Sequence, residues 1–451
     1  MKLGLIAMSA TRAHNEELTK LGFTLPGFVD RSRVIASLPS LGLLTLAGLT
    51  PPEIEMEYLD VPDLAEVEGL PGEFDVVAIS SFTAQIREAY ELADRYRAAG
   101  TKVLMGGLHV TALPDEARQH ADAIVIGEGE PTWPRMMGDL QRNRLQPVYD
   151  SRKRPFNLAR SPLPRFDLLD HDRYNRMTVQ TARGCPFSCE FCAASMRLSP
   201  FYRVKPVENV IAEIRHIKEF QPEPFIEFAD DNTFVNKRHG KALMRALEKE
   251  NVRWFTETDV SVAEDDELLA LMRDAGCVQV LIGFESTTRE GLSGIEQKSD
   301  WKAQQVDDYM AAVDKIQGYG ISVNGCFVLG MDNDGPECFQ NVVDFVRESG
   351  LYDVQITILT AFPGTPLYDR LLAEDRIIEK QAWHLCTLFD VNFKPRHMTP
   401  ETLESQFRWL VTELYGEEFT AERHGKFRAR QAALQASSGR EEVTTHERHA
   451  G

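Results

Sequence analysis

The chain has 451 residues, a length that predicts two or three domains. Hydrophobic residues make up 43% and charged residues 26%, which is typical of a packed globular protein and excludes wholesale disorder. The formal net charge of −19 opposes binding to nucleic acid, and no stretch approaches the ~20 apolar residues of a membrane helix. We therefore expect neither a nucleic-acid partner nor a transmembrane segment.

The amino-terminal residues and the cysteine usage indicate a reducing compartment. A short apolar run meets Arg12 and acidic residues too early for a signal peptide. The seven cysteines are an odd number without a secretion signal, which favours metal-binding or buried thiols over disulfides. The expected location is the cytoplasm.

The first part of the chain alternates short apolar runs with amphipathic stretches. This alternation predicts a parallel sheet with crossover helices, in a Rossmann-like α/β domain over residues 1–142. Residues 143–175 contain scattered prolines and no sustained period, so we expect an ordered linker. The predicted strands of the sheet cover residues 2–9, 53–60, 75–81, 102–107 and 123–130.

The same alternation restarts over residues 176–378 and predicts six strand–helix units, which is a partial (β/α)6 barrel. In such a barrel the chemistry lies at the carboxyl ends of the strands. Residues 379–425 are expected to form a small, mainly helical cap with a helix around 401–415, and residues 426–451 a polar, flexible tail. The six predicted barrel strands cover residues 178–182, 225–229, 253–258, 278–283, 322–329 and 354–359.

Three cysteines follow the first barrel strand with the spacing C-x3-C-x2-C: Cys185, Cys189 and Cys192. Soft thiolates at this spacing favour an iron–sulfur cluster, zinc or copper(I). Structural zinc needs a closed shell of four ligands, and no fourth ligand lies nearby in the sequence. Three cysteines on a [4Fe–4S] cluster leave one iron open to a ligand that is not protein. Buried thiols, or zinc with a distant fourth ligand, remain the alternatives.

With Phe191 as the aromatic before the last cysteine, this loop resembles that of the radical S-adenosylmethionine enzymes. The resemblance implies that Cys185, Cys189 and Cys192 ligate a [4Fe–4S] cluster and are the catalytic positions. It further implies that S-adenosylmethionine chelates the open iron, and that an external electron donor such as flavodoxin or ferredoxin triggers release of a 5′-deoxyadenosyl radical.

The resemblance also implies positions that bind S-adenosylmethionine at the ends of the later strands. Asp230, Asp231 and Asn232 would replace a Gly-Gly-Glu-like stretch, while Gly330 and Pro363 would shape the backbone beside the adenine. Glu257 and Glu285 could hold polar parts of the ligand or form salt bridges on the barrel rim. The full set is Phe191, Asp230, Asp231, Asn232, Glu257, Glu285, Gly330 and Pro363.

The glycines of the first domain do not form a G-x-G-x-x-G fingerprint. They resemble instead the cobalamin-binding domain that precedes the barrel in one radical S-adenosylmethionine subgroup, nearest to the hopanoid C2 methylase-like branch. The D-x-H-x-x-G motif for an axial histidine is absent. His109 would face the nucleotide tail or simply hydrogen-bond the next loop. The implied cobalamin contacts are Ser80, Ser81, Thr83, Gly106, Gly107, His109, Gly127 and Glu128.

The implied activity is methylation of an unactivated carbon of a small-molecule, lipid or natural-product substrate, through a 5′-deoxyadenosyl radical and methylcobalamin. An alternative is a radical reaction without methylation, such as a rearrangement, an oxidation or another group transfer. A third hypothesis, from another class, is an iron–sulfur electron carrier or scaffold.

Overall fold

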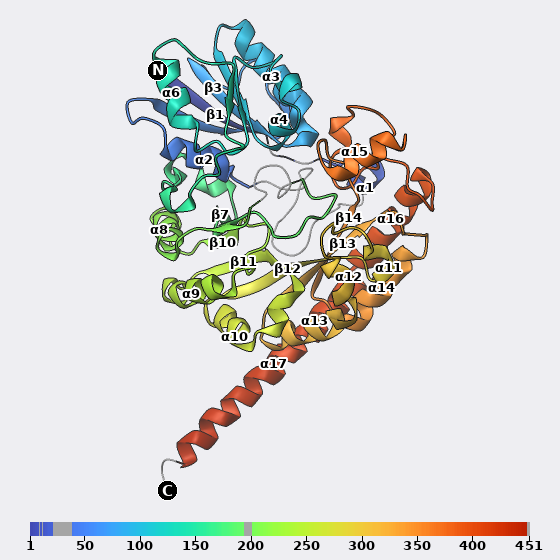
Figure 1. Cartoon of the computed structure of the whole chain (residues 1–451). Coiled ribbons are helices and arrows are strands. Elements are labelled where there is room, and N and C mark those ends of the chain that lie inside the picture. Colours follow the sequence, from blue (N-terminus) through green and yellow to red (C-terminus); the bar gives the residue numbers. More distant parts are fainter. Residues whose placement is uncertain (9, 11, 21–37, 194–200, 449–451) are drawn as a thin grey trace.

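A computed structural model describes residues 1–8, 10, 12–20, 38–193 and 201–448. Two parallel sheets lie one above the other, each packed against helices, and a carboxyl-terminal segment flanks both (Figure 1). Among the described residues, no helix combines the length and the apolar character that crossing a membrane requires.

The amino-terminal sheet has the strand order β2-β1-β3-β4-β5-β6, and all its neighbours are parallel. The strand order reverses between β1 and β3, so the carboxyl ends of these strands form a switch point, the usual place for a ligand in such sheets. The sequence did not predict β6, because a strand of only three residues shows no periodic pattern. This strand lies within the expected linker. The strands are β1 (Lys2–Met8), β2 (Glu55–Asp60), β3 (Val76–Ser81), β4 (Lys102–Gly106), β5 (Ala123–Ile126) and β6 (Val148–Asp150).

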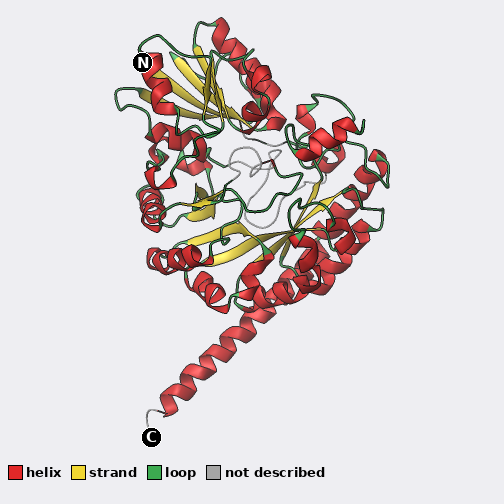
Figure 2. Cartoon of the chain, viewed as in Figure 1, coloured by secondary structure: helices red, strands yellow, loops and turns green. Residues whose placement is uncertain are grey.

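Helices cover both faces of this sheet (Figure 2). On one face Val77 and Ile79 pack in a core with Tyr96 of α3, and on the other Leu5 packs in a core with Trp133 of α6. Burial on both faces explains why these strands are continuous apolar runs. The helices are α1 (Glu16–Lys20), α2 (Leu41–Gly48), α3 (Ile86–Ala98), α4 (Leu108–Ala112), α5 (Pro114–Ala117) and α6 (Trp133–Gln141).

The second sheet is parallel and follows chain order, β14-β13-β12-β11-β10-β7, which confirms the six predicted barrel strands. The amphipathic helix α8 buries Val210, Ile214 and Ile217 against it. The strands are β7 (Met177–Val179), β10 (Phe225–Phe228), β11 (Arg253–Thr258), β12 (Cys277–Glu285), β13 (Ser322–Leu329) and β14 (Asp353–Ile358). The helices are α8 (Val207–Lys218), α9 (Lys237–Leu247), α10 (Asp266–Asp274), α11 (Arg289–Leu292), α12 (Trp301–Gln305), α13 (Tyr309–Gly318) and α14 (Cys338–Ser349).

The first barrel strand ends earlier than predicted. The backbone amides of Thr181 and Ala182 donate to Asp230 Oδ1, at 2.7 and 2.9 Å, instead of continuing the parallel ladder. The chain then forms β8 (Ala182–Arg183), which pairs antiparallel with β9 (Arg203–Val204). A buried carboxylate thus turns the chain out of the sheet just before the first cysteine.

The carboxyl-terminal segment contains α15 (Pro366–Ala373), α16 (Pro400–Tyr415) and α17 (Glu417–Arg448). Helix α16 confirms the predicted helix around 401–415. Helix α17 extends away from the body of the molecule, through the segment for which the sequence predicted a flexible tail (Figure 1). Its many Ala, Gln, Glu and Arg residues favour a helix, and its first half packs on the barrel, where Arg423 is buried and His424 Nε2 lies 3.2 Å from Asp353 Oδ1.

Candidate cofactor site

The cysteine loop starts at Gly184, directly after β8, and lies at the carboxyl ends of the barrel strands. Burial raises the pKa of Cys185 to about 11 and that of Cys189 to about 12, and a negative charge on Cys192 would raise both further. The three thiols therefore lie close enough to sense one another. Cys185 and Cys189 therefore stay protonated until a metal replaces the proton.

The segment after β12 fastens one side of the loop. Glu296 accepts hydrogen bonds from the amides of Ser188, at 3.1 Å, and Ser299, at 2.7 Å, and such bonds lower its pKa to about 2 although burial opposes this. The Glu190 amide donates to Ile295 O at 2.9 Å, and Cys189 forms a β-bridge with Glu296. An ionised carboxylate is the centre of this attachment.

Helix α15 fastens the other side. Arg370 donates two hydrogen bonds to Glu190, between Cys189 and Phe191, from Nη2 at 2.6 Å and from Nε at 3.1 Å. The same guanidinium contacts Asp332 at 2.6 Å, which follows β13. The loop is thereby fixed to the ends of the fifth and sixth strands. Phe187 adds a stacking contact with Trp301, with ring centroids 4.8 Å apart.

The three residues predicted at the end of the second strand have different surroundings. Asp230 is buried and, besides the two amides, accepts from the hydroxyls of Thr181 and Thr233 at 2.5 and 2.9 Å. Asn232 is held by Asp259 at 2.7 Å. Only Asp231 lines the cavity described below, and it also accepts from the Gly184 amide at 3.0 Å. Asp230 and Asn232 therefore bind neighbouring protein groups and do not line the cavity.

Inside the barrel, Glu257 at the end of β11 faces carboxylates from the neighbouring strands. Burial among protein atoms, and then the charges of Glu227, Asp231 and Glu285, raise the pKa of Glu257 to about 8. Its side chain is nonetheless exposed in the open interior and has no hydrogen-bond partner among the described residues. Glu257 is thus free to meet a ligand there.

Glu285 behaves differently, because it forms an ion pair with Lys302. It lies at an irregularity in the β12–β13 ladder and has a positive φ of 63°. Lys302 also donates to Gly283 O at 3.0 Å. Although burial lowers it, the charge of Glu285 and its hydrogen bond hold the pKa of Lys302 above its usual value, so a cation stands beside Glu285.

The remaining barrel positions contact protein rather than an open space. Gly330 has a φ of 92°, and a Cβ added there would meet Leu403 at 2.8 Å, so this glycine lets α16 approach closely. Pro363 is buried in the turn before α15, and Phe191 is partly buried against the core.

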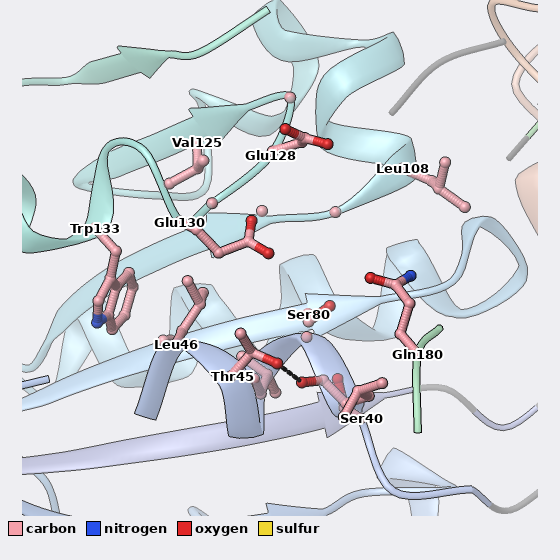
Figure 3. A pocket seen from close by; sticks show the side chains of 18 of the residues that line it. Ser40, Thr45, Leu46, Ser80, Leu108, Val125, Glu128, Glu130, Trp133 and Gln180 are labelled. Carbon is pink, nitrogen blue, oxygen red and sulfur yellow. Dashed lines mark hydrogen bonds between the residues drawn. The ribbon is translucent and has the colours of Figure 1, made fainter. Parts of the chain in front are cut away.

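A cavity of about 380 Å³ opens at the carboxyl edge of the amino-terminal sheet. Ser80 and Glu130 approach it from that sheet and Gln180 from the barrel side (Figure 3). Helix α2 forms a further wall. Of the predicted cobalamin contacts, six line this cavity: Ser80, Ser81, Gly106, Gly107, Gly127 and Glu128.

Two glycines keep this edge bare. Gly107 has a φ of 107°, and a Cβ there would stand 3.4 Å from Ser80 Oγ. Gly127 has a φ of 84°, and its Cβ would meet Ser151 Oγ at 2.8 Å. Both conformations favour glycine, and both glycines line the cavity.

Thr83 and His109 lie elsewhere. His109 is buried, its Nε2 is 3.1 Å from Glu116 Oε1, and its Nδ1 is 3.4 Å from Thr83 Oγ1. Trp383 of the carboxyl-terminal segment donates to the same Glu116 at 3.2 Å. His109 therefore joins α4 to the next helix and to the cap, which is the simpler of the two roles expected for it.

Sequence reasoning missed the residues that hold the loop. Glu296, Trp301 and Arg370 stand 100 or more positions from the loop they contact, and none belongs to a local pattern. Arg183 adjoins the cysteine motif, but nothing in the motif shows that it pairs with Glu128 and Glu130.

The donor set fits the expected cofactors. Three thiols on a firmly held loop suit a cluster with one open iron. Among the described residues, no three Cys, His, Asp or Glu side chains meet around one point as they would for a single metal ion. The cavity has the size of a site for a drug-like ligand, so it could hold a part of cobalamin such as its nucleotide end.

Comparison with known sequence families gives the same division of the chain. Residues 36–136 match the B12 binding domain, residues 179–346 the radical SAM superfamily, and residues 365–449 a domain of unknown function. The first two carry the cavity and the cysteine loop. A radical SAM domain implies a [4Fe–4S] cluster and S-adenosylmethionine, and a B12 binding domain implies cobalamin.

Curated relatives span most of the chain. An uncharacterized methyltransferase of Synechocystis sp. is 30% identical over 84% of this chain and 71% of its own length. The bacteriochlorophyllide d C-12(1)-methyltransferase of Chlorobaculum tepidum is 29% identical, covering 86% and 84%. The hopanoid C-2 methylase of Rhodopseudomonas palustris is 27% identical, covering 76% and 66%.

Among solved structures, the radical S-adenosylmethionine methyltransferase TsrM from Kitasatospora setae, with cobalamin and a [4Fe–4S] cluster bound, has the same fold. Its TM-score is 0.62 at 15% identity, over 90% of this chain and 85% of that one. The matches to known sequences, the order of the two sheets and the cysteine loop all support the same family. The chain belongs to the radical S-adenosylmethionine superfamily, in the group whose barrel follows a B12 binding domain.

Proposed function

We propose that this protein is a cobalamin-dependent methyltransferase that methylates an unactivated carbon of a small molecule or lipid. One observation carries the proposal: residues of both domains line the cavity, Gly107 and Glu128 at the edge of the amino-terminal sheet, and Arg183 and Asp231 beside the start of the cysteine loop. A site for one cofactor therefore opens against the site for the second.

The chain's residues have distinct roles in this proposal. Cys185, Cys189 and Cys192 would hold the cluster, and the glycine edge at Gly107 and Gly127 would face cobalamin. When bound, cobalamin would carry the methyl group, while the cluster and S-adenosylmethionine would supply the radical that removes a substrate hydrogen. The protein holds these groups in place and keeps water from the radical.

Glu257 is the described carboxyl group best placed to meet S-adenosylmethionine or substrate. It lies inside the barrel without a hydrogen-bond partner, and its raised pKa lets it donate or accept a proton near neutral pH. Glu285 is neutralised by Lys302, so this pair presents a polar surface without net charge. Glu296 and Arg370 stabilise the loop rather than touch the reacting atoms.

The substrate class follows from the relatives' names and from the chemistry. Bacteriochlorophyllides and hopanoids are large, mainly apolar ring systems, and both serve as first probes. The donor of the single electron is proposed to be a flavodoxin or ferredoxin. These proteins and S-adenosylmethionine are cytoplasmic, so we place the enzyme there.

The test is anaerobic turnover with S-adenosylmethionine bearing a deuterated methyl group, titanium(III) citrate as reductant and bacteriochlorophyllide d or a hopanoid as probe. Methyl transfer gives S-adenosylhomocysteine alongside 5′-deoxyadenosine, and label in the probe. Formation of 5′-deoxyadenosine alone with both probes would favour a radical reaction without methylation. No cleavage of S-adenosylmethionine by the reduced, cluster-loaded protein would favour an electron carrier.

A further inference from the structure

Four charged residues join the amino-terminal domain to the β8–β9 pair at the wall of the cavity. Glu128 and Glu130 come from the loop after β5, whereas Arg183 and Arg203 lie opposite each other in the β8–β9 pair. We call these four residues the interdomain ion cluster. Its two positive and two negative charges balance.

The four residues of this cluster are joined by hydrogen bonds between defined atoms. Arg183 donates to Glu128 Oε1 at 3.2 Å and to Glu130 Oε1 at 2.7 Å. Arg203 donates to both oxygens of Glu128, one of them at 3.2 Å, and to Phe156 O at 2.7 Å. The Phe156 amide donates to Glu128 Oε2 at 2.5 Å. One carboxylate thus binds both arginines and a backbone amide.

The cluster is largely removed from water. The side chains of Glu128 and Glu130 are 6% and 8% exposed, and those of Arg183 and Arg203 are 18% and 20% exposed. Although burial opposes its ionisation, Arg203, the Phe156 amide and Arg183 lower the pKa of Glu128, so its charge persists. Removing one partner would leave an uncompensated buried charge, which is strongly destabilising.

The position of the cluster gives it a further consequence. Glu128, Glu130 and Arg183 line the cavity, and Arg183 is two residues before Cys185. Gly184, between them, is fixed by Asp231. Any rotation of the amino-terminal domain about this contact would move the cavity relative to the cysteine loop.

We propose that the interdomain ion cluster fixes the position of the cobalamin cavity relative to the cysteine loop, with Arg183 as its positioning residue. This inference rests on the proposed function, because it assigns the cluster to the alignment of two cofactors. Arg183 acts through Glu128 and Glu130 and touches neither reacting atom. Loss of the cluster would loosen this wall of the cavity and, with it, the placement of the cavity relative to the cysteine loop.

The test compares Arg183→Gln, Glu130→Gln and the double variant with the full-length protein. Arg183→Lys keeps the charge but loses the two-pronged geometry. The matched control is Arg165→Gln, which removes an arginine side chain that pairs with Asp167 at 2.6 and 2.7 Å and does not line the cavity. All variants are compared at equal iron and sulfide content.

The first measurement needs no turnover. Hydroxocobalamin titrations should show about tenfold weaker binding for Arg183→Gln and for Glu130→Gln, and a smaller effect for Arg183→Lys. The double variant should lose less than the product of the two single losses, because the two residues share one interaction. Hydrogen exchange of peptides over residues 148–157 and 182–193 should be faster in Arg183→Gln and unchanged in Arg165→Gln.

The second measurement separates alignment from general stability. In a single turnover with hydroxocobalamin, titanium(III) citrate and S-adenosylmethionine, the ratio of S-adenosylhomocysteine to 5′-deoxyadenosine should change by about tenfold in Arg183→Gln. A merely destabilised protein would form less of both products at an unchanged ratio.

Cobalamin affinity and exchange rates equal to those of the unmodified protein in Arg183→Gln and Glu130→Gln would overturn the inference. Equal losses in Arg165→Gln would overturn it as well. If Arg183→Gln fails to fold, Arg183→Lys and Glu130→Gln carry the same comparison. If the binding and exchange effects appear but the unmodified protein transfers no methyl group, the proposed function fails while the coupling between domains stands.

Discussion

The carboxyl edges of the two sheets meet at one site but are built in opposite ways. The amino-terminal edge is shaped by the absence of side chains, with Gly107 and Gly127 in conformations that suit glycine. The barrel edge is shaped by charged side chains, among them Glu296 and Arg370, which hold a short loop from two sides. The difference indicates that the first edge admits a large ligand, while the second fixes a small one.

The largest effect is expected at the loop itself. The triple variant Cys185→Ala/Cys189→Ala/Cys192→Ala should lose its iron and sulfide, because no thiolates remain to bind the cluster. Cleavage of S-adenosylmethionine should fall to background. Iron and sulfide assays with product analysis measure both effects, and Cys338→Ala, on α14, is the control that should retain them. Full cluster content in the triple variant would refute the ligand assignment.

The attachment of the loop is tested by Glu296→Ala. The change removes the acceptor of the Ser188, Lys298 and Ser299 amides, so the free energy of unfolding should drop by about 3 kcal/mol. Since the pKa of Glu296 is lowered from 4.5 to about 2, its contribution is complete above 4.5 and disappears as the pH falls toward 2.

Urea unfolding of the unmodified protein and the variant, at neutral and acidic pH, measures this difference. Glu290→Ala, at an exposed position on α11, is the control and should change stability little. A difference that persists undiminished in acid would contradict the role of the Glu296 charge.

The bare edge is tested by Gly127→Ala. The substitution forces an alanine to adopt a φ of 84° and places its Cβ 2.8 Å from Ser151 Oγ. We expect a loss of about 1 to 2 kcal/mol in stability and about tenfold weaker binding of hydroxocobalamin. Gly100→Ala is a matched control, since its φ is 88° and nothing lies within 4 Å of the added Cβ. Equal cobalamin affinity in both variants would show that the glycine edge does not face the ligand.

The smallest effect is expected at Glu257. Its pKa is raised from 4.5 to about 8, so the folded protein keeps a proton that the unfolded chain has lost, and stability falls as the pH rises between these values. Glu257→Gln should therefore reduce this fall in Tm, measured on the cofactor-free protein. Glu264→Gln, on the barrel exterior, should not. A pH profile of Tm unchanged by Glu257→Gln would mean that Glu257 is ionised in the folded state.

Much of the site was predictable because its signals are local. The spacing of Cys185, Cys189 and Cys192 and the glycines after β4 and β5 are contained in short stretches, and six apolar runs gave the barrel strands. The roles of Asp230 and His109 were not predictable. Each belongs to a residue type that binds ligands as readily as it binds protein, and only the surrounding atoms decide between the two.

The sequence by itself determined the two sheets, their order, the three thiols and the family to which the chain belongs. Periodicity and motif spacing depend on neighbours along the chain, so they survive without coordinates. Only the tertiary structure decided that Arg370 and Glu296 hold the loop, that Gly330 accommodates α16, and that Glu128 pairs with Arg183 and Arg203. These contacts join residues 50 to 180 positions apart, and a single charged residue carries no mark of its distant partner.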